Sequence, residues 1–258
     1  MTNIWLTSSH SFQQYLPKIS DTLNKYAINI NGHFWEDNLK NMSWKYVYEE
    51  IAMSDFSLWL IFLSSDEWEK FSIRYAISLL TIAVQQKKGL NFPIVILKLP
   101  EDSLNSEMLP DPMKNLEILS LSIQDIGPEL ISQKHKSSVL REREYHIGVH
   151  VNPIYGQWFE VGPVNSTWKK GSIFGVKGAE ITFQGVGNRG VLPQECTLES
   201  PVEGIKVTTR TDEYIAWIIQ NEINKDTSHF IQVKGDPSAI ILGEHVEGLS
   251  GLLYVNRF

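Results

Sequence analysis

The first half of the chain alternates between short apolar runs and stretches in which apolar side chains recur every three or four residues. Such runs fit β-strands and such periods fit amphipathic helices. The pattern predicts strands at residues 3–6, 27–30, 56–63, 93–99 and 116–121, and helices at 12–26, 44–51, 66–86 and 123–134. Strands and helices that alternate with short connections predict an α/β domain with a five-stranded parallel, flavodoxin-like sheet.

The helical period disappears after residues 138–144, a stretch with two Arg and two Glu that we interpret as a linker. From residue 145 onward, short β-like runs are separated by turns that contain Gly or Pro, such as Asn152-Pro153. Many short strands with turn residues between them predict an antiparallel β-sandwich or barrel. We therefore expect an α/β domain at residues 1–137 and an all-β domain at residues 145–258.

Charge and composition exclude several classes of protein. The net charge of −7 is spread evenly, with 12 basic and 16 acidic side chains in residues 1–137 and 11 and 14 in residues 138–258. Neither half has the clustered Lys and Arg that nucleic-acid binding requires. The chain has no secretory signal and no apolar run near the roughly 20 residues that span a bilayer. With Cys196 as the single cysteine, no intrachain disulfide can form. We expect a cytoplasmic protein that contacts neither nucleic acid nor membrane.

Residues 55–77 contain the most informative local pattern. An apolar strand ends in Leu63-Ser64, a polar loop follows, and a helix contains Ser72-Ile73-Arg74-Tyr75-Ala76. This order resembles the third strand and following helix of a Toll/interleukin-1 receptor (TIR) domain, in which Leu-Ser precedes a Trp-Cys-x-x-Glu helix. Residues 35–51 resemble the loop and helix that follow the second strand in the same family. The resemblance covers residues 1–135 and implies the TIR fold.

TIR domains that hydrolyse NAD use the glutamate of that helix, and Ala76 stands at its position. A carboxylate there stabilises the charge that develops on the ribose, which a methyl group cannot do. The resemblance therefore implies a domain that does not hydrolyse NAD. Glu67 and Glu69 lie one to two turns earlier and are the alternative catalytic carboxylates. Surface solvation explains both glutamates more easily than a catalytic role does, and helix propensity explains Ala76.

Residues 31–38 are predicted to form a loop that opens with an Asn-Gly turn. Its Trp35 can stack on a base and its Asp37 can hydrogen-bond a ribose, or its aromatic pair can simply cover the core. Ser8 and Ser9 end the first strand, at the edge where open α/β sheets bind ligands, although helix caps use the same residue types. The predicted site for NAD or a related nucleotide comprises these four residues with Arg74, Tyr75 and Ala76. No cofactor is required. In TIR domains the loop that corresponds to residues 31–38 also mediates self-association.

Aromatic residues and histidines are the chemical candidates of the second half. A sugar-stacking platform can form from Trp158 and Trp168, with Tyr155 and Trp217, although aromatic residues of a small sandwich more often form its core. His146 and His150 lie on one face of a predicted strand, about 13 Å apart at roughly 3.3 Å per residue. They cannot bind one ion directly, so no metal site is predicted.

Two further motifs of the second half receive structural interpretations. Residues 185–190, Gly-Val-Gly-Asn-Arg-Gly, are flanked by β-like residues and are predicted to form a hairpin turn rather than a phosphate-binding loop. Cys196 has no nucleophile motif around it and is interpreted as a packed thiol.

Three functions fit these patterns. The first is a non-hydrolysing TIR-like adaptor of an immune or antiviral signalling system, whose β-domain binds a ligand or a partner protein. The second is a TIR NAD glycohydrolase that uses Glu67 or Glu69. The third is a carbohydrate-binding β-sandwich protein. Alanine at position 76 favours the first.

Overall fold

The computed structural model describes residues 2–39, 44–135, 143–152, 156–245 and 253–258 of the chain. The chain divides into two compact units, Met1–Arg141 and Glu142–Phe258. Residues 138–142 of the expected linker lie outside the described residues. Each unit has its own sheets, and each is considered by itself.

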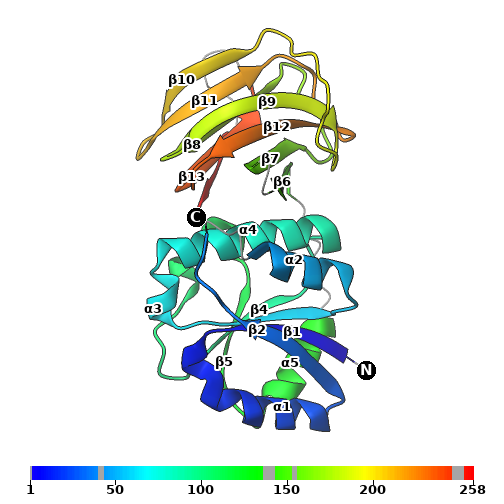
Figure 1. Ribbon diagram of the computed structural model, residues 1–258, viewed down its shortest axis with the longest axis vertical. Coiled ribbons are helices and arrows are strands. Elements are labelled where there is room, and N and C mark those ends of the chain that lie inside the picture. The colour runs from blue at the N-terminus through cyan, green and yellow to red at the C-terminus, as the bar shows by residue number, and fades with distance from the viewer. Residues whose placement is uncertain (1, 40–43, 136–142, 153–155, 246–252) are drawn as a thin grey trace. The chain divides into compact units, whose positions relative to one another are not determined.

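Five parallel strands form the sheet of the first unit, in the order β2-β1-β3-β4-β5. The strands are β1 (Thr2–Ser8), β2 (Ile28–Phe34), β3 (Leu58–Phe62), β4 (Ile94–Lys98) and β5 (Glu117–Ser120). Helices α1 (Leu16–Lys25) and α5 (Ile126–His135) lie on one face, and α2 (Trp44–Met53) and α4 (Phe71–Lys88) on the other (Figure 1). The shorter helices are η1 (His10–Tyr15), α3 (Ser65–Trp68), η2 (Ser106–Met108) and η3 (Asp111–Met113). The predicted α/β character of this half is confirmed.

The centre of this sheet is its most buried part. Every residue of β3 is buried, as its continuous apolar run predicts. Leu58, Leu60 and Phe62 belong to the core cluster on the side of α1 and α5, where burying each Leu or Phe contributes roughly 1.5–3 kcal/mol. Phe12 of η1 stacks on Phe62 with 3.9 Å between ring centroids. The helix predicted at residues 12–26 is therefore divided, because η1 covers the end of β3 before α1 begins.

Strand β2 runs through the residues that were predicted to form a turn. Asn31 and Gly32 both pair with β1, so the predicted Asn-Gly turn is wrong. A Cβ atom on Gly32 would lie 2.1 Å from the carbonyl oxygen of Leu6. The glycine thus permits a close approach between two strands. The longer strand carries His33 and Phe34 to the carboxyl edge of the sheet.

The single helix predicted at residues 66–86 is broken into α3 and α4. Ser64 and Glu67 form a capping box at the start of α3, in which the Ser64 backbone N–H donates to the Glu67 carboxylate at 2.8 Å. Lys70 is then extended, with φ −72° and ψ 121°, before α4 begins. Although α4 is largely apolar, no helix among the described residues is long and apolar enough to cross a membrane.

The second unit consists of two antiparallel sheets (Figure 1). One has five strands in the order β10-β11-β8-β13-β14, and the other has four in the order β6-β7-β12-β9. The strands are β6 (Tyr145–Asn152), β7 (Gly156–Pro163), β8 (Ser172–Lys177), β9 (Glu180–Asn188), β10 (Val202–Thr208), β11 (Glu213–Ile219), β12 (Thr227–Lys234), β13 (Ala239–Glu244) and β14 (Leu253–Arg257). The all-β character predicted for this half is confirmed.

The inner faces of the two sheets meet through apolar rings and one buried imidazole. Phe159 of β7 and Phe174 of β8 are fully buried, with 5.5 Å between their ring centroids. His229 of β12 contacts Ser172 Oγ on β8 at 3.0 Å and Gln184 Oε1 on β9 at 3.2 Å. Because a carboxamide oxygen only accepts, Nε2 carries the proton and the Ser172 hydroxyl donates to Nδ1. Burial lowers the pKa of His229 to about 3, so the ring is neutral at physiological pH.

Strand β9 is longer than its predicted β-like run. It extends through Gly185 and Gly187, so the first half of the hairpin turn predicted at residues 185–190 is wrong. The chain then returns across the outer face of the sheet, where Pro193 and Cys196 lie 3.3 and 3.2 Å from the position of a Cβ on Gly185. Cys196 is exposed rather than packed, because its sulfur rests on this outer face.

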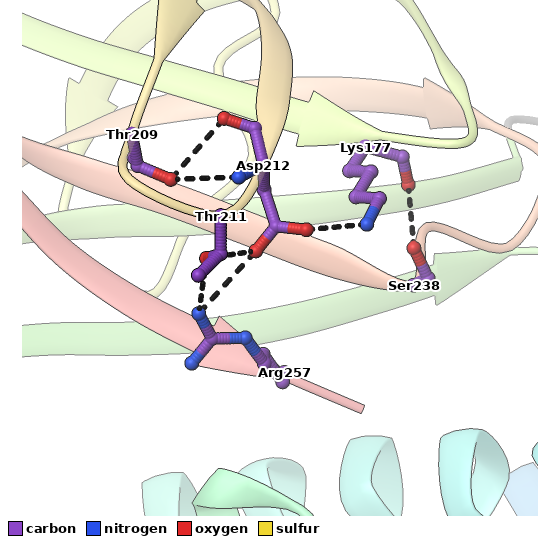
Figure 2. A network of polar contacts seen from close by, with 6 residues as sticks. All are labelled: Lys177, Thr209, Thr211, Asp212, Ser238 and Arg257. Carbon is purple, nitrogen blue, oxygen red and sulfur yellow. Dashed lines mark hydrogen bonds and ion pairs between the residues drawn. The ribbon is translucent and has the colours of Figure 1, made fainter.

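A polar network fixes the turn between β10 and β11 (Figure 2). The carboxylate of Asp212 accepts hydrogen bonds from Lys177 of β8 at 2.5 Å, Thr211 at 2.8 Å and Arg257 of β14 at 3.3 Å. Its backbone N–H donates to Thr209 Oγ1 at 3.1 Å. The side-chain hydrogen bonds, led by that from Lys177, lower the pKa of Asp212 to about 2. One carboxylate therefore ties this turn to two strands of the sheet.

We expect Asp212→Asn to destabilise the protein near neutral pH and to have little effect near pH 2. The folded-state pKa of about 2 lies below the ordinary value of 3.8. The ionised carboxylate therefore stabilises the fold above pH 3.8, and this contribution is lost as the pH falls through about 2. Thermal denaturation of the full chain across this range measures the effect. Glu213→Gln, which removes an exposed ion pair with Lys206, is the control. Equal melting temperatures of Asp212→Asn and the natural protein at neutral pH would contradict the prediction.

Candidate functional site

A pocket of about 310 Å³ lies at the carboxyl end of β2. Its walls come from the end of β2, the two residues after it and the first turn of α2: His33, Phe34, Trp35, Glu36, Tyr46 and Val47. Its volume is that of a small ligand site, which begins near roughly 300 Å³. Open α/β sheets bind ligands at the carboxyl ends of their strands. Because four of the six lining residues carry aromatic rings, the pocket suits a flat ligand.

Polar atoms of the pocket walls have unused hydrogen-bonding capacity. Among the described residues, neither ring nitrogen of His33 nor the indole Nε1 of Trp35 has a hydrogen-bond partner, although all three atoms are buried. Burial lowers the pKa of His33 to about 4, so at neutral pH the ring has one donor and one acceptor. A buried polar atom without a partner costs about 1–3 kcal/mol. A ligand that supplies the missing partners would recover this cost.

Ser8 and Ser9 lie beside this pocket without lining it. The backbone N–H of Trp35 donates to the carbonyl of Ser8 at 2.8 Å, and that of Ser9 donates to the carbonyl of Phe62 at 3.2 Å. The Ser8 hydroxyl donates to the Ser9 carbonyl at 3.1 Å, and the Ser9 side chain caps η1. These contacts bring the carboxyl ends of β1, β2 and β3 together. The two serines therefore build the edge of the sheet through local hydrogen bonds.

Asp37 links the segment after β2 to α4. Its carboxylate accepts a hydrogen bond from Ser72 Oγ at 2.9 Å. The other α4 residues of the predicted site, Arg74, Tyr75 and Ala76, do not line the pocket. Tyr75 and Ala76 are 1 % and 3 % exposed, and the Tyr75 ring stacks on Phe71 with 5.5 Å between ring centroids. Of the predicted ligand-binding residues, the structure thus places Trp35 in the pocket and Asp37 at its margin.

Neither alternative carboxylate lines the pocket. Glu67 is engaged in the capping box of α3, where its carboxylate also accepts from the Ser64 hydroxyl at 3.0 Å. Glu69 is exposed at the end of the same short helix. The carboxylate among the lining residues is that of Glu36. A reaction in this pocket would therefore depend on Glu36.

The tryptophans predicted to form a sugar-stacking platform in the second unit do not lie together on one face. Trp168 is 6 % exposed and exchanges backbone hydrogen bonds with Ile223, so it is a core residue. Trp217 lies on β11 of the five-stranded sheet, whereas Trp158 lies on β7 of the other sheet. Tyr155 lies outside the described residues. Trp158 keeps a partly exposed ring, which packs edge-on against Phe183 of β9 with 5.7 Å between ring centroids.

Glu160 of β7 forms a buried polar cluster that sequence analysis missed. Its fully buried carboxylate contacts His150 Nε2 at 2.6 Å and His146 Nε2 at 3.4 Å, and accepts hydrogen bonds from Ser228 Oγ and the Gly190 N–H, both at 2.8 Å. Burial alone raises the pKa of Glu160, but the contacts with His146 and His150 and the hydrogen bond from Gly190 outweigh it and bring the pKa well below its usual range. The carboxylate is therefore ionised inside the domain.

The side chains of the two histidines converge on one carboxylate. In the part of the chain that the structure describes, no group of three or more His, Cys, Asp or Glu side chains is arranged to hold a metal. Gly148, between His146 and His150 on β6, pairs opposite Glu160. The missing side chain at this glycine leaves room for the carboxylate. The His-x-Gly-x-His spacing was visible in the sequence, but the strand opposite it was not.

Comparison with known proteins assigns neither a family nor a function to this chain. No protein-family model matches the sequence, and no curated protein matches it significantly. The case for a function therefore rests on the two sites described above and on the local resemblance at residues 35–76.

Proposed function

We propose that the first unit is a TIR-like module that binds NAD or a related nucleotide without hydrolysing it. The protein would act as a cytoplasmic adaptor in an immune or antiviral signalling system. The observation that carries the proposal is the aromatic pocket at the end of β2, in which buried nitrogen atoms of His33 and Trp35 have no partner among the described residues. Phe34, Trp35 and Tyr46 can enclose a base or a nicotinamide ring, and the two free donors and one acceptor can bind its polar edge.

The strand order supports the TIR-like part of this proposal. The order β2-β1-β3-β4-β5 is that of flavodoxin-like sheets, to which the TIR fold is similar. The pocket occurs in the segment, from Trp35 onward, that resembles the family's loop after the second strand. Asp37 and Ser72 join this segment to the helix of the second match. Both local matches thus lie at one edge of the sheet.

The positions of Ala76 and Glu67 support the proposed lack of hydrolysis. Ala76 has no charge to offer, and Glu67 is held in a helix cap. The adaptor role requires the module to associate with a second copy or with another protein. It also requires the β-unit to bind a separate ligand or partner. Self-association through the segment after β2 is the mode that the family resemblance favours.

Glu36 supports one enzymatic alternative. Its carboxylate lines the pocket, so NAD glycohydrolysis with Glu36 in place of the missing helix glutamate is the second candidate function. This alternative differs from the sequence-based one, which used Glu67 or Glu69.

One experiment on the full chain separates the two functions. Isothermal titration with NAD should show binding that Trp35→Ala weakens by about tenfold or more, since the indole supplies both stacking and a donor. Met53→Ala is the control, because Met53 is an exposed residue of α2 that does not line the pocket. Chromatography of NAD after long incubation with concentrated protein should show no release of nicotinamide.

Two results would overturn the proposal. Release of nicotinamide that Glu36→Gln abolishes would establish the enzymatic alternative. NAD binding that Trp35→Ala leaves unchanged, or the absence of any NAD binding, would show that the pocket does not hold this nucleotide.

A further inference from the structure

A straight row of four side chains crosses the outer face of the four-stranded sheet in the second unit. His150 of β6 pairs opposite Trp158 of β7, Trp158 opposite Gln232 of β12, and Gln232 opposite Phe183 of β9. Directly opposed residues of neighbouring strands project from the same face. With strands about 4.8 Å apart, this outer row is roughly 14 Å long.

The outer row presents aromatic and polar side chains in alternation. Phe183 is 49 % exposed and the side chain of His150 is 20 % exposed, while Trp158 and Gln232 are partly buried. Thr182 donates a hydrogen bond to Gln232 Oε1 at 3.0 Å, which fixes the orientation of that carboxamide. Exposed apolar side chains that lie together are typical of interaction sites, whereas isolated ones are not. Two rings separated by hydrogen-bonding groups favour a ligand with both apolar and polar faces.

Glu160 gives the outer row a rigid polar end. Glu160 lies two residues after Trp158 on β7 and projects from the same face. Its fully buried carboxylate contacts His150 Nε2 at 2.6 Å. This contact fixes the ring and leaves Nδ1 as the nitrogen that can face a ligand. Removing an ionised carboxylate from water costs several kcal/mol of desolvation free energy, and here the carboxylate is buried on the outer face of the sheet. Ionised groups with strongly shifted pKa values in such positions are typical of functional sites.

The charges around the outer row select the class of ligand. None of its four members is Lys or Arg, and residues 138–258 have 11 basic and 14 acidic side chains. An anionic ligand, such as a phosphate ester or a nucleic acid, would find no cation in the row, and Lys234, the next residue of β12 on this face, pairs opposite Glu180. Trp158 and Gln232 lie on the interior strands β7 and β12, whose backbone groups are already paired, so the middle of the row offers no sheet edge to an added strand of a partner protein. A neutral molecule rich in hydroxyl groups satisfies both conditions.

We propose that the outer row binds a neutral saccharide. The apolar faces of the sugar rings pack on Trp158 and Phe183, and the hydroxyl groups between them hydrogen-bond to His150 and Gln232. This site uses residues of β6, β7, β9 and β12 alone, so it is independent of the nucleotide pocket. It retains Trp158 from the platform that the sequence suggested and replaces the buried Trp168 by Phe183 and His150.

A glycan array of neutral oligosaccharides, probed with the full chain, tests this proposal. Affinity electrophoresis in gels that contain the corresponding neutral polysaccharide gives the dissociation constant. Trp158→Ala and Phe183→Ala should each weaken binding by roughly tenfold, and His150→Gln by less. Trp217→Ala removes an indole from the other sheet and serves as the matched control. Circular dichroism and melting temperature verify that each variant remains folded.

Retention of binding in Trp217→Ala together with its loss in Trp158→Ala and Phe183→Ala would support the site. Binding that survives both ring substitutions would place the saccharide elsewhere and overturn the proposal. Binding confined to charged glycans, or to none on the array at high protein concentration, would equally overturn it. NAD titration of the same variants should be unchanged, which separates failure here from failure of the nucleotide pocket.

Discussion

Lowering the pH from about 7 to about 3 is expected to destabilise the second unit by about 4 kcal/mol through His229 alone. The folded-state pKa of this buried imidazole is about 3, against an ordinary value of 6.5. The unfolded chain therefore binds a proton that the folded chain excludes. The contribution of neutral His229 to the stability of the fold is complete above pH 6.5 and is lost as the pH falls towards 3. About 2.5 kcal/mol of the loss falls above pH 4.5, where carboxylates are only partly protonated.

Hydrogen exchange of the β12 and β13 amides in the full chain, corrected for the intrinsic exchange rate, measures this opening free energy. His229→Gln retains a donor and an acceptor for Ser172 and Gln184, and it should abolish the slope between pH 6.5 and about 4.5. His10→Gln, which replaces an exposed histidine of the first unit, should leave the slope intact. An opening free energy that is constant across this window in the natural protein would show that His229 is not buried in its neutral form.

Replacement of Glu160 by alanine is expected to cost about 3–5 kcal/mol at neutral pH. The substitution removes the acceptor that Ser228, Gly190 and His150 share at a fully buried position, and it leaves a cavity there. Glu160→Gln keeps one acceptor oxygen and should cost less. Because the folded-state pKa of Glu160 lies below its usual value of 4.5, the difference between the natural protein and Glu160→Gln should shrink as the pH falls below about 4.5.

Calorimetry of the full chain measures these costs. Glu213→Ala, which removes an exposed carboxylate paired with Lys206, is the control and should cost less than about 1 kcal/mol. If Glu160→Ala is as stable as this control, the buried cluster is not a major contributor to the fold.

The helices and strands of both halves could be predicted because buried apolar residues recur in the sequence with the period of a helix or a strand. The wholly apolar run that became β3 and the helical period that became α2 needed only local information. Errors arose where a tertiary contact overrode a local preference. Asn31 and Gly32 favour a turn, yet pairing with β1 holds them in a strand. The break before α4 depends on the capping box at Ser64, which a uniform apolar period conceals.

The candidate sites were only partly predictable for a related reason. Trp35 was found because aromatic and acidic residues lie together in the sequence, whereas Tyr46 joins the same pocket from α2. Glu160 could not be assigned to the two histidines without the register of β6 and β7. The outer row combines residues from four strands, and its order of pairing is a property of the fold alone. Sequence proximity thus identified single residues, while sheet register determined their partners.

Cys196 gives the molecule a built-in attachment point for a spectroscopic reporter. It is the single thiol of the chain, it is exposed, and its sulfur lies against Gly185, two residues along β9 from Phe183. A maleimide dye or spin label would react at this one position without any engineered substitution. Occupancy of the neighbouring sheet face could then be followed as a change in emission or label mobility in the otherwise natural protein.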